Sequence, residues 1–205
     1  MAAPSHETFR VAYVLGVTPG KWARTWNDRM PGRPLELRPV SGTEAVDALL
    51  TGAADVALLR LPLEQPGLSS IPLYVERSVV VVPKDHLVEA LDSVFLSELD
   101  GMLDGDWAAS VELVAANAGV AVMPQSVARA LSRRDVVARP VTDGPETQVA
   151  LAWATDRTTA DVEEFIGIVR GRTANSSRGQ PTPKTPKPPR APRPAGPGAK
   201  RPRRR

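Results

Sequence analysis

Short apolar runs alternate with segments of helical periodicity over the first 170 residues, and this alternation limits the fold more than any other feature of the chain. The first run, residues 9–15, is rich in β-branched and aromatic residues, which favour strands. Trp22, Trp26 and Met30 follow at a spacing of four, which places them on one face of a helix. Strands that alternate with helices in this way predict an α/β fold with a largely parallel sheet.

The pattern continues to residue 169. Further strands are expected over residues 35–40, 55–60, 71–75, 78–82, 120–123, 136–141 and 149–153, and shorter helices over 93–99, 110–118 and 124–134. Three helices have recognisable starts, and the last is a capping box expected at Thr158 and Asp161. Thr18 is expected to cap the first, with Pro19 at its first helical position. Ser41 and Glu44 predict a capping box, in which each side chain binds the other residue's backbone N–H.

The end of the chain differs in composition from the rest. Residues 171–205 hold 8 Arg, 3 Lys and no acidic residue, and residues 181–205 contain nine prolines but no large apolar side chain. Without apolar surface to bury, such a segment does not offset the chain entropy lost on folding. We therefore predict one folded domain over 8–170 and a disordered basic tail over 171–205. Residues 1–170 keep 15 basic and 23 acidic residues, so the domain is acidic.

Eleven cations without an anion are typical of a segment that binds polyanions. The tail residues expected to contact nucleic acid are Lys184, Lys187, Arg190, Arg193, Lys200, Arg201, Arg203, Arg204 and Arg205. Such contacts reach phosphates and do not read sequence, and a tail without aromatic residues is not expected to stack on single strands. The alternative is a solubilising tail that pairs with the acidic domain.

Several classes of protein are excluded by what the sequence lacks. No run of about 18 apolar residues is present, so no membrane span is expected. The N-terminus has no charged segment followed by an apolar one, so no secretory signal is expected. The absence of cysteine excludes disulfides and thiolate metal sites. We expect a cytoplasmic protein that does not contact a membrane.

No catalytic, metal or cofactor site is expected. Gly16, Gly20 and Lys21 approximate a phosphate-binding loop, but the spacing is one residue short and no Ser or Thr follows the lysine. His6 and His86 lie far apart, and neither is part of a metal-ligand pattern. The chain is therefore not expected to be an enzyme.

Five separated segments carry a more specific signal. They read LLTGAADVAL at 49–58, IPLYVERSVVVVPKDHL at 71–87, SEL at 97–99, VAANAGVAVMP at 114–124 and VALAW at 149–153. In this order they resemble the effector-binding, or substrate-binding, domain of LysR-type transcription regulators over about residues 8–170. The resemblance implies the fold of type 2 periplasmic binding proteins, in which crossing strands join two α/β lobes and a small ligand binds in the cleft.

The resemblance also sets expected boundaries. Lobe I is expected over 8–82 plus 145–170, and lobe II over 83–144. The family's N-terminal winged helix-turn-helix is not expected, because the first strand begins at Phe9. Lobe II is expected to be shortened, because 14 residues separate Leu99 from Val114 where the family usually has several tens. Members of the family commonly form homodimers, which is a further expectation here.

Two loops lie where an open α/β sheet binds ligands, between the end of a strand and the start of a helix. One holds Thr18, and the other holds Ser41, Gly42 and Thr43. Unpaired N–H groups and the helix dipole favour a carboxylate or phosphate there. The matching positions contact the effector in the family, and the alternative is that Thr18 and Ser41 only cap their helices.

Two further residues are candidate ligand contacts. Arg60 ends a strand and is expected either to pair with an anionic ligand or to be solvated. Asn117 stands where the family usually has glycine, at a position that faces the cleft from lobe II in the family. Because asparagine tolerates a left-handed backbone, the alternative for Asn117 is a turn residue.

The preferred interpretation is a non-enzymatic sensor of a small organic anion, related to LysR-type regulators but without its own helix-turn-helix. The alternative is a nucleic-acid-associated interaction protein that binds DNA or RNA through its tail. A transport-type solute-binding protein would share the fold, but the missing signal peptide and the absence of a lipid-anchor cysteine argue against it.

Overall fold

The computed structural model describes residues 8–172 of the 205-residue chain. The strands are β1 (Phe9–Val14), β2 (Leu35–Val40), β3 (Val56–Arg60), β4 (Leu68–Glu76), β5 (Ser78–Pro83), β6 (Ala121–Pro124), β7 (Val136–Pro140) and β8 (Thr147–Ala154). The α-helices are α1 (Gly20–Arg29), α2 (Gly42–Thr51), α3 (Trp107–Ala115), α4 (Gln125–Ala130) and α5 (Ala160–Val169). Three 3₁₀ turns are η1 (Leu87–Ala90), η2 (Leu96–Glu98) and η3 (Thr155–Arg157).

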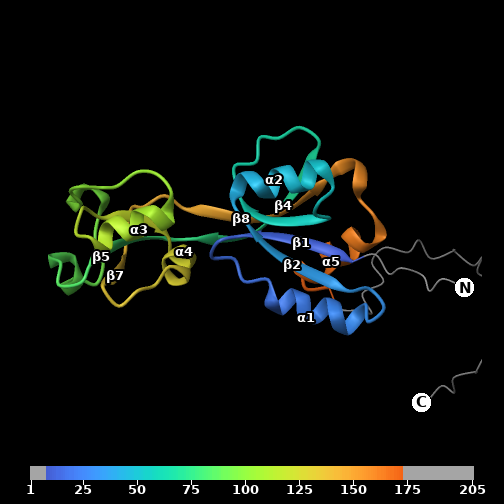
Figure 1. Cartoon of the computed structure of the whole chain (residues 1–205), viewed down its shortest axis with the longest axis horizontal. Helices are drawn as coiled ribbons and strands as arrows, with labels where there is room; N and C mark the ends of the chain where they lie inside the picture. Colours follow the sequence, from blue (N-terminus) through green and yellow to red (C-terminus); the bar gives the residue numbers. More distant parts are fainter. Residues whose placement is uncertain (1–7, 173–205) are drawn as a thin grey trace, which may run out of the picture. The chain divides into compact units, whose positions relative to one another are not determined.

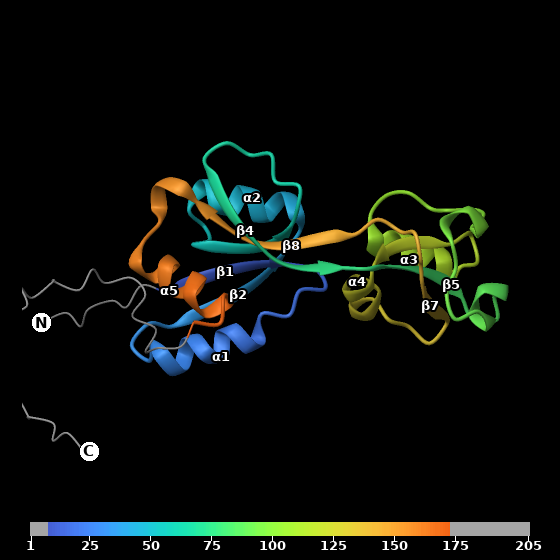
Figure 2. The same cartoon turned by 180° about the vertical axis from the view of Figure 1, so that it is seen from behind.

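The strands form two sheets. The large sheet has the order β2-β1-β3-β8-β4, and the small sheet has the order β6-β5-β7. Helix α2 covers one face of the large sheet, and α1 and α5 cover the other (Figure 1). The chain passes from the large to the small sheet between β4 and β5, and returns between β7 and β8 (Figure 2).

The prediction of a largely parallel sheet is wrong. Strand β1 runs parallel to β2 and β3, but β8 runs antiparallel to β3 and β4, and both pairs of the small sheet are antiparallel. The chain comes back from the small sheet as β8, which lies between β3 and β4 in the large sheet. Neither β3 and β8 nor β4 and β8 are therefore joined by the crossover helix that parallel neighbours need. Parallel and antiparallel buried strands both read as apolar runs, so the periodicity did not distinguish them.

The change of sheet falls at Arg77 rather than near residue 83, because β5 pairs with β6 and β7. Strand β5 is the centre of the small sheet and is buried on both faces. Val79 and Val81 pack on one side with α3 and α4, whereas Val80 and Val82 pack on the other side. That second side is covered by 3₁₀ turns and loops. The expected helix over 93–99 is therefore wrong; η2 is short, and Val94 forms a parallel bridge to Val141.

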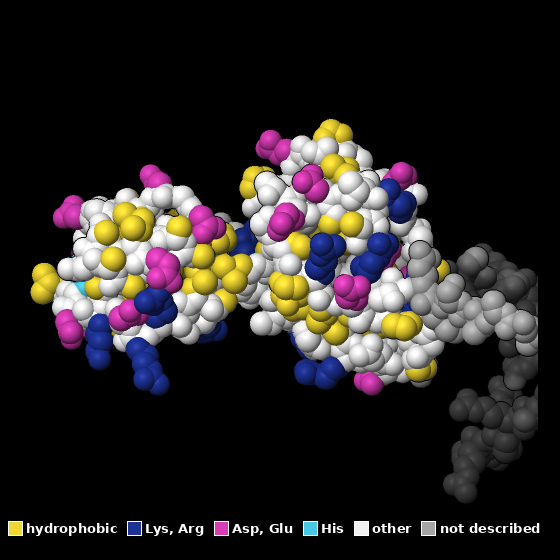
Figure 3. Space-filling model, viewed as in Figure 1, with side chains coloured by type: hydrophobic (Ala, Val, Ile, Leu, Met, Phe, Trp, Pro, Cys, Tyr) yellow, Lys and Arg dark blue, Asp and Glu magenta, His cyan; other side chains and the backbone are white. Residues whose placement is uncertain are grey.

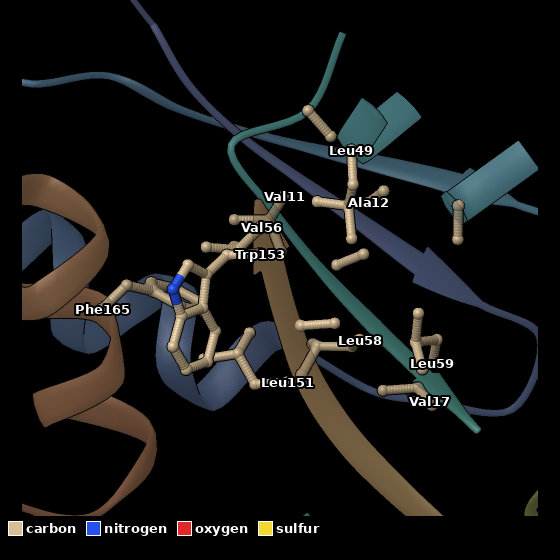
Figure 4. Packing of buried hydrophobic residues seen from close by; sticks show 14 of the residues in the cluster. Val11, Ala12, Val17, Leu49, Val56, Leu58, Leu59, Leu151, Trp153 and Phe165 are labelled. Carbon is tan, nitrogen blue, oxygen red and sulfur yellow. The ribbon is translucent and has the colours of Figure 1, made fainter. Parts of the chain in front are cut away.

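An aromatic cluster anchors the core of the large-sheet part. The Phe9 and Trp26 rings stack with centroids 4.3 Å apart, and Phe165 of α5 lies 5.5 Å from Phe9 and 5.9 Å from Trp26. The expected buried face of the first helix is confirmed, because Trp22 and Trp26 are its buried residues. Figure 4 shows Phe165 beside the Trp153 indole, with Val11 of β1 and Val56 of β3 above the indole in this view.

The predicted helix starts differ in outcome. The expected cap at Thr158 is wrong, because α5 is capped by Thr159, whose Oγ1 accepts the Val162 N–H at 3.3 Å. The capping box is confirmed: Ser41 Oγ accepts the Glu44 N–H at 3.3 Å, and Glu44 Oε2 accepts the Ser41 N–H at 2.8 Å. The prediction that Thr18 caps the first helix is wrong. Pro19 is the N-cap there, and its carbonyl accepts the N–H groups of Trp22 and Ala23. None of the helices in the part that the structure describes has the length and hydropathy that a membrane crossing needs.

Replacing Phe165 by alanine tests this account of the core. Phe165 is fully buried, so Phe165→Ala is expected to lower the free energy of unfolding by about 3–5 kcal/mol. Phe95 is 50% exposed, and Phe95→Ala is a matched control that is expected to cost less than about 1 kcal/mol. Urea unfolding followed by circular dichroism measures both values. Equal losses for the two variants would contradict the packing described here.

Candidate ligand site

A cavity of about 450 Å³ lies at the carboxyl ends of the parallel strands, and we call it the Arg60 cavity. The ends of β1, β2 and β3, the start of α2 and the start of α3 all contribute to it. Its lining residues are Val14, Leu15, Val40, Ser41, Gly42, Thr43, Val46, Leu59, Arg60, Pro62, Leu63, Asp106 and Trp107. Four of the six predicted ligand contacts, Ser41, Gly42, Thr43 and Arg60, therefore line one cavity.

The start of α2 supplies backbone donors to this cavity. The capping box uses the N–H groups of Ser41 and Glu44, and the Ala45 N–H donates to the Ser41 carbonyl. The N–H groups of Gly42 and Thr43 have no acceptor within the helix, because they belong to its first turn. A group with negative charge is favoured at this position, since the helix dipole points its positive end there.

The carboxylate of Glu44 is part of this arrangement. The backbone N–H of Ser41 and then its hydroxyl hold the pKa of Glu44 below its ordinary value. Glu44 is fully exposed, so it is ionised at neutral pH and completes the cap without filling the cavity.

Arg60 is held by four separate parts of the chain. Its Nε donates to Glu76 Oε2 at 2.9 Å, its Nη1 to the Leu15 carbonyl at 2.9 Å and its Nη2 to Ser126 Oγ at 3.1 Å. The guanidinium also lies over the Trp107 ring, 5.2 Å from the centroid. The Arg60 side chain is 10% exposed and that of Glu76 is 5% exposed. The expected alternative of a solvated Arg60 is therefore wrong, because the side chain forms a buried ion pair.

The start of α3 closes the cavity from the side of the small sheet. Asp106 caps this helix, and its Oδ1 accepts the Ala109 N–H at 3.0 Å. Trp107 is the first helical residue and lies against Arg60. Neither residue was predicted as a site residue, because the helix was expected to begin at residue 110. An aspartate followed directly by a helical segment was the signal that could have found them.

Thr18 and Asn117 lie outside the Arg60 cavity. Thr18 lines a second hollow with Glu76 and Ser126. Asn117 follows α3, has a φ of 61° and lines a third hollow with Lys84 and residues of the 133–135 turn. Its left-handed backbone fits the alternative of a turn residue. The structure does not bring Thr18 or Asn117 together with Ser41 and Arg60, so neither residue is part of the candidate site.

The basic residues that were expected to contact nucleic acid, from Lys184 to Arg205, lie outside the described residues. Their role stays a prediction. In the part that the structure describes, no group of three or more His, Asp or Glu side chains is placed to hold a metal ion.

Comparison with known families gives a match over most of the chain. Residues 6–102 and 105–174 match the family described as the LysR substrate binding domain. The interruption at residues 103–104 falls in the segment between Leu99 and Val114 that is short for the family.

Two curated regulators are similar in sequence. The Hca operon transcriptional activator HcaR of Escherichia coli K12 is 24% identical over 180 residues, which are 72% of this chain and 60% of that protein. The HTH-type transcriptional regulator ShiR of Corynebacterium glutamicum strain R is 40% identical over 72 residues, which are 35% of this chain and 24% of that protein. The chain thus spans less than two thirds of each of these relatives.

Solved structures confirm the expected fold. The effector binding domain of a BenM variant aligns with a TM-score of 0.68 and 18% identity, over 80% of this chain and 93% of that one. The reduced regulatory domain of OxyR from Pseudomonas aeruginosa aligns with a TM-score of 0.62 and 20% identity, over 80% of this chain and 94% of that one. Both have the two-sheet α/β architecture of the type 2 periplasmic-binding-protein kind.

The cap of α2 predicts a pH dependence of stability. The pKa of Glu44 is lowered in the folded chain, so its contribution is present at neutral pH and is lost as the pH falls through the folded pKa. Glu44→Gln is expected to be less stable than the natural chain at neutral pH, with a difference that shrinks as the pH falls through the lowered pKa of Glu44. Urea unfolding over a series of pH values from neutral to acidic measures this difference. Glu64→Gln removes the same charge from a surface loop and is the control, and a pH-independent loss in Glu44→Gln would contradict the prediction.

Proposed function

The chain belongs to the LysR substrate-binding domain family, and from this premise we propose that it senses a small organic anion in the Arg60 cavity. Its relatives are transcriptional regulators and their effector-binding domains, which are not enzymes. We propose the same for this chain: a regulatory module that acts through binding and not through catalysis. We also propose that it acts in the cytoplasm and as a homodimer.

The observation that carries the proposal is the placement of Arg60 beside the start of α2. Both line one cavity, and both favour negative charge: Arg60 through its guanidinium, and α2 through the N–H groups of Gly42 and Thr43. A carboxylate between them would accept hydrogen bonds from each. Because Arg60 is already held by Glu76, Leu15 and Ser126, it would not need to be reordered on binding.

The rest of the lining favours an organic ligand over an inorganic anion. Val14, Leu15, Val46 and Leu59 supply aliphatic surface, and Trp107 supplies an aromatic face. A cavity of about 450 Å³ is within the range of small-molecule sites. A solved BenM effector domain is described with its effector benzoate, which is an anion of this class. We therefore propose a carboxylate with a small apolar body.

We propose that residues 8–172 act as a sensor and do not themselves include a DNA-reading helix-turn-helix. Each α-helix between residues 8 and 172 packs against one of the two sheets or contributes to its core. We propose that any reading of a DNA sequence depends on residues outside the described part or on a partner.

A second candidate function rests on the composition of residues 171–205, whose eleven cations are not balanced by any acid. On the face shown in Figure 3, basic and acidic side chains of the described part are interspersed, so this face offers no continuous basic surface. We propose that affinity for DNA or RNA, where present, comes from the C-terminal cations and is independent of base sequence.

Substitution of Gly42 tests the anion site. A Cβ built at Gly42 meets nothing within 4 Å, so alanine is tolerated there, but its methyl group would enter the space beside the start of α2. Calorimetry with a panel of small carboxylic acids is expected to find a ligand whose Kd rises about tenfold in Gly42→Ala, from a steric cost of about 1.4 kcal/mol.

Gly20→Ala is the matched control for Gly42→Ala. Gly20 is likewise the first residue of its helix and has nothing within 4 Å of a built Cβ, but it does not line the cavity. Its Kd is expected to equal that of the natural chain. A ligand whose affinity changes equally in the two variants, or a folded protein that binds no carboxylate of the panel, would contradict the proposal.

Truncation tests the second candidate function. The full chain is expected to bind duplex DNA with a slope of log K against log salt of about −4 to −6, which corresponds to about half of the C-terminal cations engaged. A chain of residues 1–172 is expected to lose this binding, because its net charge is negative. Fluorescence anisotropy at several salt concentrations measures both. Equal binding by the two chains would contradict it.

A further inference from the structure

A second hollow, of about 340 Å³, lies on the other side of the Arg60–Glu76 ion pair, and we call it the Glu76 hollow. Its lining residues are Gly16, Thr18, Lys21, Trp22, Tyr74, Glu76 and Ser126. It shares no lining residue with the Arg60 cavity, although Glu76 and Ser126 both contact Arg60. The Glu76 hollow and the Arg60 cavity are therefore separate candidate sites.

Glu76 lines this hollow, and one of its carboxylate oxygens is an unused hydrogen-bond acceptor. Its side chain is 5% exposed, and Oε2 accepts from Arg60 Nε. The other oxygen, Oε1, is buried and accepts no hydrogen bond from any described residue. Buried polar atoms are almost always paired, and a buried carboxylate oxygen is among the costliest to leave without a donor. An unpaired buried acceptor on a side chain that lines a hollow therefore points to a ligand that donates a hydrogen bond.

The rim of the hollow carries a cation and a hydroxyl, which favour a hydrogen-bond acceptor on the ligand. The Lys21 ammonium lies at the start of α1, 4.8 Å from the centroid of the Trp22 ring, and forms no ion pair among the described residues. The hydroxyl of Thr18 is not used as a helix cap, which leaves it available to a ligand. Lys21 and Thr18 thus favour an acceptor at the mouth, whereas Glu76 favours a donor at the floor.

Two further residues shape the hollow, Tyr74 as a hydrogen-bond donor and Gly16 as part of one wall. Burial, and next the charge of Glu76, raise the pKa of Tyr74, so its phenol stays protonated and can donate. Gly16 has a φ of 87°, and a Cβ there would lie 2.6 Å from Ser126 Oγ. Only glycine allows this close approach of the β1–α1 loop to the start of α4, and the approach closes one wall of the hollow.

We propose that the Glu76 hollow binds a small zwitterion of the α-amino acid class, with its ammonium group on Glu76 Oε1 and its carboxylate toward Lys21 and Thr18. A simple anion would place its charge against the unpaired carboxylate oxygen, and a simple cation would face Lys21. A zwitterion satisfies both ends. The Trp22 ring supplies the apolar contact for its side chain.

The test uses the full chain and commercially available probes. A thermal-shift screen of the twenty L-amino acids is expected to find at least one that stabilises the protein, and calorimetry then gives its Kd. The N-acetyl derivative of that amino acid lacks the ammonium group, and its methyl ester lacks the carboxylate. Each derivative is expected to bind at least about tenfold more weakly, because each loses a charge-assisted hydrogen bond.

Two variants assign the binding to this hollow. Lys21→Met is expected to weaken binding of the amino acid about tenfold and to leave the affinity of its methyl ester unchanged. Lys84→Met removes the same charge from the surface beside the small sheet, outside this hollow, and is expected to bind as the natural chain does. Glu76→Gln is expected to abolish binding, and circular dichroism of that variant shows whether it is folded.

Three results would overturn the proposal. They are a folded protein that no amino acid stabilises, an N-acetyl derivative that binds as well as the free amino acid, and equal affinities in Lys21→Met and Lys84→Met. None of these depends on the Arg60 cavity, so failure here leaves the anion proposal standing, and failure of the anion proposal leaves this one standing.

Discussion

The buried ion pair of Arg60 and Glu76 is the interaction on which the rest of the molecule depends. Arg60 ends β3 and Glu76 ends β4, and their side chains are largely withdrawn from water. Burying two charges is costly unless each is fully hydrogen-bonded, so the guanidinium is completed by the Leu15 carbonyl and Ser126 Oγ. The pair therefore fixes the strand ends, the β1–α1 loop and the start of α4 relative to one another.

Both proposed sites follow from the position of this pair. The Arg60 cavity and the Glu76 hollow lie on its two sides, at the end of the large sheet where β1, β2 and β3 give way to loops and helices. Helix starts collect at this end because β1 and β2 are each followed by a helix. One side offers a guanidinium and the amides of α2, and the other offers an unpaired carboxylate oxygen below a lysine. The ion pair thus divides one region into two sites of different chemistry.

Local features of the structure could be predicted from the sequence, and long-range pairings could not. The Ser41 capping box and the buried face of Trp22 and Trp26 depend on residues within one helix, and both are confirmed. Thr18 failed as a cap because a proline in helical conformation took that position. The direction of β8 failed because an apolar run does not reveal which strands it pairs with.

In the candidate site, too, the local features could be predicted from the sequence and the long-range contacts could not. Ser41, Gly42 and Thr43 could be predicted as ligand contacts from their place at a helix start, and they line the cavity. The end of a strand indicated Arg60 as well, but not its partners, because Glu76 lies 16 positions away and Ser126 lies 66 positions away. Asp106 and Trp107 were missed because the short connection before α3 reads as a loop. Contacts between residues this far apart in the sequence are set by the fold, and the hydrophobic periodicity of the sequence does not reveal them.

A double-mutant cycle on Arg60 and Glu76 tests the central claim most directly. The free energy of unfolding is measured for the natural chain, Arg60→Met, Glu76→Gln and the double variant. We predict that each single change costs about 3–5 kcal/mol, because it leaves a buried charge unpaired. The double variant is expected to lose about 2–3 kcal/mol less than the sum of the two single changes. Costs that add to within about 0.5 kcal/mol would contradict the account, because they would mean that the two side chains do not depend on each other.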